Sequence, residues 1–162
     1  MSAVDYLLTI KGIKGESKDA SHKGAIHVES WSWGASNVGT MQKDGGGGGG
    51  RAKMRDFFFT TRLGSATPGL MRRLASGEHI PEAVLICRKA GKTPQEFLRI
   101  VLEDVIVSSY RVDSARGDGP TPTEVVGLNF ASVSFQYREQ KSDGTLGGKL
   151  VATHSLKQNS TS

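Results

Sequence analysis

Residues 96–110 read EFLRIVLEDVIVSSY, a run in which nonpolar side chains occupy both sets of alternating positions. One set contains Leu98, Ile100, Leu102 and Ile106, and the other contains Phe97, Val101, Val105 and Val107 together with Arg99 and Glu103. Because successive side chains of a strand point to opposite faces, the run predicts a long β-strand that is nonpolar on both faces. A barrel fills only its inner face, so the outer nonpolar face indicates contact with another subunit.

The same period of two recurs along most of the chain. Strands are predicted for residues 4–10, 25–33, 54–63, 83–89, 96–110, 126–137 and 149–156, with turn signals such as Ser142-Asp143-Gly144 between them. Strands at this spacing are typical of a barrel or a sandwich. The fold class is therefore mainly β: a compact β-barrel, made of two packed antiparallel sheets, with one short α-helix and a long Gly-rich loop. Residues 1–157 are expected to form one domain, and residues 158–162 a flexible polar tail.

Two strands change phase. In residues 25–33 the nonpolar side changes near Ser30, and in residues 126–137 it changes at Ala131–Ser132, which indicates a β-bulge or a bend. Trp31 and Trp33 are two residues apart and share a face, so they are predicted to be core aromatics while Ser32 points the other way.

One helix is predicted after residue 66. Thr67 is expected to be its N-cap, with Pro68 at the first helical position and Gly77 as the C-terminal stop. Leu70, Met71, Leu74 and Ala75 are expected to form one buried stripe.

Residues 39–53 surround six consecutive glycines, Gly45–Gly50. With no side chains to bury and maximal backbone freedom, this segment is predicted to be a long, mobile loop. It is either a linker or an arm that reaches a neighbouring subunit, where Arg51, Lys53 and Arg55 would meet acidic residues such as Glu16 or Asp19. It is not a phosphate-binding loop, because no Gly-Lys-Ser/Thr precedes a helix.

The sequence predicts neither an enzyme nor a cofactor-binding protein. The four histidines lack metal-binding spacing, the single Cys87 allows neither an intrachain disulfide nor a cysteine metal site, and no Gly-x-Ser-x-Gly motif is present. Glu103 and Asp104 fall on opposite faces of their strand, which is the wrong geometry for shared acid–base chemistry. Cys87 lies in a nonpolar run and is expected to be buried.

The first residues lack a basic stretch followed by a nonpolar one, so no cleavable signal peptide is expected. No run approaches the ~20 nonpolar residues that cross a bilayer, so membrane insertion is not expected either. These observations predict folding in the cytoplasm and, if the protein is exported, a route that needs no signal peptide.

Several motifs, in order, resemble one known family. They are Lys14-Gly15-Glu16-Ser17-Lys18-Asp19, Trp31-Ser32-Trp33-Gly34, a Gly-rich loop, Thr67-Pro68-Gly69-Leu70, the segment from Ala83 to Gly91, Val105 to Tyr110, and Leu128-Asn129-Phe130-Ala131. Over residues 4–148 this order resembles the haemolysin-coregulated protein (Hcp) family of the type VI secretion system.

The resemblance implies a homo-hexameric ring of β-barrels. Such rings stack into a hollow tube that a contractile sheath drives out of the cell behind a tip protein, and the lumen holds small effector proteins. The protein would thus be in the bacterial cytoplasm before firing and extracellular afterwards. In this setting Ser32 is predicted to line the lumen, and Gly45, Gly46, Gly47, Gly48, Gly49, Gly50, Arg51 and Lys53 are predicted to contact the next ring or subunit.

The alternative is a basic β-barrel that binds single-stranded nucleic acid. The formal net charge is +5, and Phe57–Phe59 lie near Arg51, Lys53, Arg55 and Arg62. This function requires exposed aromatic rings among cations in one groove. The positive charges are otherwise scattered, so no nucleic-acid partner is expected.

Overall fold

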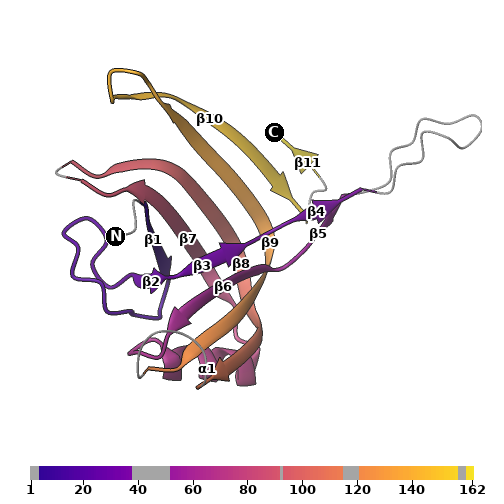
Figure 1. Cartoon of the computed structure of the whole chain (residues 1–162). Coiled ribbons are helices and arrows are strands. Elements are labelled where there is room, and N and C mark those ends of the chain that lie inside the picture. Colours follow the sequence, from indigo (N-terminus) through magenta and orange to yellow (C-terminus); the bar gives the residue numbers. More distant parts are fainter. Residues whose placement is uncertain (1–3, 38–51, 92, 115–120, 157–159) are drawn as a thin grey trace, which may run out of the picture.

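The computed structural model describes residues 4–37, 52–91, 93–114, 121–156 and 160–162, and the arrangement of their elements is shown in Figure 1. In chain order the elements are β1 (Val4–Ile10), β2 (Ile26–Val28), β3 (Ser30–Ser32), β4 (Ala35–Ser36), β5 (Lys53–Met54), β6 (Phe57–Arg62), α1 (Thr67–Ser76), β7 (Ile80–Lys89), β8 (Gln95–Asp113), β9 (Thr123–Gln140), β10 (Leu146–Ser155) and β11 (Ser160–Thr161). All pairings between these strands are antiparallel.

The segment that contains β2 and β3 closes the barrel. β2 pairs with β1, whereas β3 pairs with β6 on the other side. The amide of Glu29, between these two strands, already donates to the carbonyl of Thr60 on β6 at 2.8 Å. The strands of the wall are hydrogen-bonded to one another in the order β6, β9, β8, β7, β1. The wall therefore runs around the core and returns to its start. The phase change predicted near Ser30 is confirmed by this exchange of partners.

Along one edge β9 changes its partner from β6 to β10, while its other edge stays paired with β8. Its first half pairs with β6 from Thr123 to Leu128, and its second half pairs with β10 from Ser132 to Gln140. Residues 132–155 therefore form a long hairpin, here called the flange, that extends away from α1 in Figure 1. The mainly β barrel with one short helix is confirmed. Its facing layers are parts of one nine-stranded sheet, beside which lies the two-stranded ribbon β4–β5.

The barrel core is filled by aliphatic and aromatic side chains. Phe57 and Phe59 are fully buried while Phe58, between them, is exposed, as three consecutive aromatics on a strand predict. Trp31 is half-buried and stacks on Phe57 with ring centroids 5.9 Å apart. Trp33 packs against Phe135 at 5.1 Å, so both indoles lie against the core cluster.

The helix differs from its prediction in two respects. Ala66 is the N-cap and Thr67 the first helical residue, so the predicted N-cap was wrong by one position. Of the predicted stripe only Leu70 is buried, and Met71, Leu74 and Ala75 are exposed. The reason is that α1 lies across one end of the barrel (Figure 1), where Leu70 is its buried side chain. Gly77 ends the helix with φ 68°, as predicted.

The alternation predicted for residues 96–110 was also wrong in part. The buried residues are Ile100, Leu102, Val105 and Val107, so the inward phase changes between positions 102 and 105. Asp104 lies at this point with φ 53°, a left-handed conformation that asparagine and aspartate adopt more readily than most residues. On the partner strand the phase change predicted at Ala131–Ser132 is confirmed, since Phe130 and Val133 are both buried.

Most of the other strand boundaries also differ from the predicted ones. β7 begins at Ile80, three residues before the predicted start, and includes Pro81. At the C-terminus Ser160–Thr161 pair with His154 and Ser155 of β10. The division into a domain of residues 1–157 and a flexible tail of 158–162 stays a prediction.

A buried carboxylate joins the helix to the barrel. Glu124 on β9 is 1% exposed, and it accepts a hydrogen bond from the Thr67 hydroxyl at 3.0 Å. Its other oxygen accepts from the Tyr110 hydroxyl on β8. Burial, and then the carboxylate, raise the pKa of Tyr110, so the hydroxyl keeps its proton and remains a donor. Thr67 begins α1, whose positive dipole end also favours the negative charge.

Replacing Tyr110 by Phe removes one donor from this buried carboxylate. We expect Tyr110→Phe to lower the free energy of unfolding by about 1–3 kcal/mol, the usual cost of an unsatisfied buried polar group. Urea titration followed by circular dichroism measures the change. The matched control is Tyr137→Phe, because Tyr137 is 46% exposed and its substitution should change stability by less than ~0.5 kcal/mol. Equal stability of the two variants would show that the Tyr110–Glu124 contact contributes nothing.

Candidate assembly surfaces

The flange exposes nonpolar side chains on both of its faces. Leu150 pairs across the strands with Tyr137, and Val151 pairs with Gln136. Since neighbouring residues of a strand point oppositely, Leu150 and Tyr137 lie on one face and Val151 on the other. Leu150 is 69% exposed and Val151 is 52% exposed. Exposed nonpolar side chains on a projecting strand pair form a surface that another protein chain stabilises by covering it.

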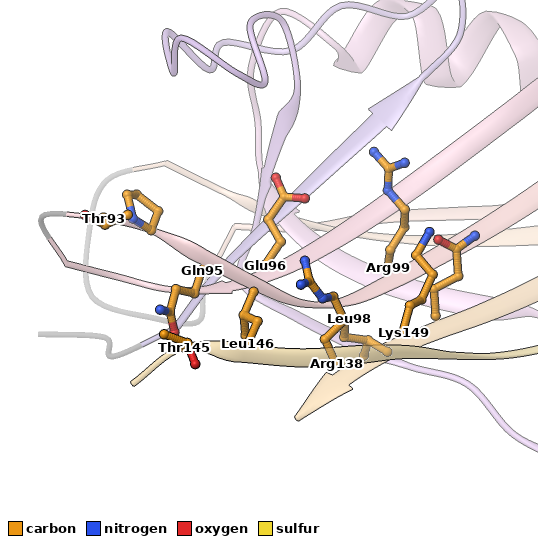
Figure 2. A pocket seen from close by; sticks show the side chains of 11 residues that line it. Thr93, Gln95, Glu96, Leu98, Arg99, Arg138, Thr145, Leu146 and Lys149 are labelled. Atoms are coloured by element: carbon orange, nitrogen blue, oxygen red, sulfur yellow. The ribbon is translucent and has the colours of Figure 1, made fainter. Parts of the chain in front are cut away.

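A groove of about 630 Å³ lies between the start of β8 and the outer half of the flange, next to its turn. Figure 2 shows the side chains that line it, and Arg99 and Lys149 rise to the same side from β8 and β10. Leu98 and Leu146 contribute nonpolar surface, while the carboxylate of Glu96 is bonded to the imidazole of His22. The groove is therefore cationic with a nonpolar part, and it continues the surface of the flange.

A second surface gathers hydroxyl groups on the outer side of the barrel and is here called the serine face. Its members are Ser30, Ser32, Thr60, Ser108 and Ser109. Ser32 is exposed on β3 opposite Phe58 of β6, and the hydroxyls of Ser30 and Thr60 are 2.6 Å apart. Ser32 thus points away from the core side on which Trp31 lies, as the spacing predicts.

Gly127 explains how Phe58 fits into the serine face. A Cβ at Gly127 would come within 2.4 Å of the Ser109 hydroxyl and 2.9 Å of the Phe58 ring. Any side chain would therefore push the ring outward, whereas glycine lets Phe58 lie close to β9. Sequence reasoning missed this role, because the only signal was a lone glycine within a predicted strand.

The loop of residues 11–25 is tied to the barrel by a charged cluster. Arg88 on β7 bonds to Asp19 at 2.9 Å and lies 3.5 Å from Asp5 on β1. The Arg88 hydrogen bond holds the pKa of Asp19 below its usual value. Asp19 therefore already has a cation in its own chain. Glu16, the other acidic partner proposed for the glycine loop, accepts a hydrogen bond from the Ser65 amide at 3.1 Å.

The predicted contact loop is only partly described. Gly45–Gly50 and Arg51 lie outside the described residues, so their role stays a prediction. Lys53 is exposed and begins β5, where it pairs with Ser36 of β4. In Figure 1 the ribbon β4–β5 extends away from the barrel wall, so Lys53 lies at the base of the predicted loop.

Potential catalytic groups have structural partners. The Ser108 hydroxyl donates to Asp56 at 2.6 Å, and the imidazole of His79 is 2.6 Å from Asp104. Cys87 is buried, and burial raises the pKa of its thiol to about 11. Within the ranges that the structure describes, no three His, Cys, Asp or Glu side chains are grouped to hold a metal ion. The one helix seen there is too short and too polar to span a bilayer.

These features define a class of protein: a mainly β, nearly closed barrel with one short helix and a projecting strand pair that exposes nonpolar side chains. Comparisons with known proteins identify the family within this class. The family described as "Type VI secretion system effector, Hcp" matches residues 7–137. The chain is 43% identical over 159 residues to Protein hcp1 of Pseudomonas aeruginosa, covering 97% of this chain and 98% of that protein.

Solved structures give the same result. "Structure of a type six secretion system protein" is similar with a TM-score of 0.91 and 28% identity, covering 99% of this chain and 100% of that chain. Hcp1 from Salmonella typhimurium is similar with a TM-score of 0.83 and 33% identity over the same shares.

The chain therefore belongs to the Hcp family, as its motifs predicted. It is a secreted structural protein of type VI secretion, in a family of structural proteins rather than enzymes.

Proposed function

We propose that this chain is the subunit of a hexameric ring, and that the rings stack into the hollow inner tube of a type VI secretion system. The tube holds small effector proteins in its lumen, and a contractile sheath expels it behind a tip protein. The subunit folds in the bacterial cytoplasm without a cleavable signal peptide and becomes extracellular on firing. Membership of the Hcp family supports this proposal.

The flange is the observation that carries the assembly. Leu150 and Tyr137 on one face, and Val151 on the other, remain exposed in the isolated chain. Covering a leucine and a valine side chain contributes about 1.5–3 kcal/mol each, and this gain recurs at every contact of a closed ring. A neighbouring copy that packs on the flange covers these side chains, while the cations of the groove near its turn meet carboxylates at the rim of the contact.

The serine face supports the proposed lumen. Its side chains are short, and Asp56 is occupied by the Ser108 hydroxyl and by the amide of Asn129 at 2.8 Å. A wall of small hydroxyl groups leaves space in a channel and offers weak, replaceable hydrogen bonds. Ser32 and the 40%-exposed ring of Phe58 are its points of contact with cargo. The glycine loop, with Arg51 and Lys53 beside it, reaches the next ring.

The first prediction from the proposed function concerns the flange. Leu150→Glu places a charge on its nonpolar face and should weaken ring formation at least about a hundredfold, which corresponds to about 3 kcal/mol per contact. Size-exclusion chromatography with light scattering measures the mass of the particle. Leu74→Glu, on the exposed side of α1, is the matched control and should leave the mass unchanged. A Leu150→Glu variant that keeps the wild-type mass would remove the flange from the assembly.

The second prediction concerns the lumen. Ser32→Gln lengthens an exposed side chain without adding charge, so rings should form normally while cargo binding decreases by about tenfold or more. Co-purification of an effector with the tagged chain measures binding, and electron microscopy shows the rings. Thr153→Gln, on β10 outside the serine face, is the comparison. Unchanged ring assembly together with unchanged cargo recovery for Ser32→Gln would rule out this role.

The third prediction concerns stacking. Deleting Gly45–Gly50 should leave a soluble ring but shorten the tubes, because the shortened loop can no longer reach its neighbour. Tube lengths in negative-stain images measure the effect. Replacement of the same six residues by alternating Gly and Ser keeps length and flexibility, and should preserve the tubes. Tubes of normal length after the deletion would contradict the role of the loop.

A further inference from the structure

A groove of about 1030 Å³ separates the loop of residues 11–25 from the start of α1. This basic groove lies on a different part of the molecule from the flange and the serine face. It is lined by Thr9, Ile10, Lys11, Gly12, Ile13, Lys14, Gly15, Glu16, Ser17, Lys18, Lys23, Gly24, Ser65, Pro68, Gly69 and Arg72. The assembly proposed above gives the lysines and Arg72 of this lining no role.

The lining is strongly cationic. Lys11, Lys14, Lys18, Lys23 and Arg72 are all exposed, and none of them takes part in the ion pairs between described residues. Glu16 is the one acidic residue of the lining, and its carboxylate is already bonded to the Ser65 amide. Five cations around one concave surface repel one another and raise the local concentration of anions.

The groove is built in advance by close backbone packing. A Cβ at Gly15 would come within 2.4 Å of the Ala25 carbonyl oxygen, so only glycine lets the loop lie this close to the start of β2. The Ser17 amide donates to the same carbonyl at 3.0 Å. On the opposite wall, a Cβ at Gly69 would be 3.3 Å from the side chain of Ile13. A preformed groove loses little conformational entropy when it binds a ligand.

We propose that the basic groove binds an acidic segment of a partner protein. Carboxylates of that segment meet the lysines, and a nonpolar side chain packs on the exposed ring of Pro68. Nucleic acid is a poor occupant, because the described lining includes no aromatic ring on which a base could stack.

This binding does not depend on ring formation, so it is tested on the full chain in whatever oligomeric state it adopts. The probe is a short fluorescein-labelled synthetic peptide of glutamate, glycine and leucine, and fluorescence anisotropy measures its dissociation constant. We expect binding at low ionic strength that weakens as salt approaches ~0.15 M. The variant Lys14→Gln/Lys18→Gln should bind at least about fivefold more weakly, since each exposed ion pair contributes modestly.

Arg111→Gln/Lys141→Gln is the matched control, because it removes the same number of cations at sites outside the groove. Its affinity for the peptide should stay within about twofold of the wild-type value. The charge-reversal variant Lys14→Glu/Lys18→Glu should lose the glutamate peptide and gain binding to a lysine peptide of the same length. Circular dichroism verifies that each variant is folded.

Three results would overturn the proposal. The first is no peptide binding even at low ionic strength, and the second is an equal loss in both double Gln variants, which would indicate only general charge attraction. The third is tighter binding of an oligothymidylate than of the peptide with the same dependence on Lys14 and Lys18, which would assign the groove to nucleic acid.

Discussion

This sheet carries more nonpolar surface than one barrel can bury, and the rest of the structure depends on that excess. The wall closes when the segment from Ile26 to Ser32 changes its partner from β1 to β6, and the core is then full of aliphatic and aromatic side chains. The second half of β9 pairs with β10, and Leu150 and Val151 of β10 remain exposed on opposite faces. A second chain is the natural cover for a strand pair of this kind.

Much of the fold follows from residue periodicity. The phase change near Ser30 predicted the exchange of strand partners there, and the change at Ala131–Ser132 marks the point where β9 changes its partner from β6 to β10. The sequence did not reveal the matching change at Asp104, because a left-handed residue inside a strand leaves no periodic signal. It also overestimated the buried stripe of α1. Met71 and Leu74 repeat at helical spacing, but a helix that lies across a barrel end offers only Leu70 to the core.

The candidate surfaces were less predictable than the fold. Ser32 could be placed on an outer face by counting from Trp31, yet the hydroxyls of Ser108 and Ser109 join it only through the pairing of β3, β6, β9 and β8. The basic groove was hidden for the same reason, since Arg72 is separated along the chain from the lysines of the loop. Gly15 and Gly127 carry no pattern, and their role appears only when the neighbouring atoms are placed.

Native mass spectrometry of the purified wild-type chain, with negative-stain images of the same sample, tests the role of the exposed flange most directly. The expected result is a closed, annular particle of several identical subunits that persists on dilution to micromolar concentration. A stable, soluble single chain at high protein concentration, with no annular particles in any buffer, would contradict the account.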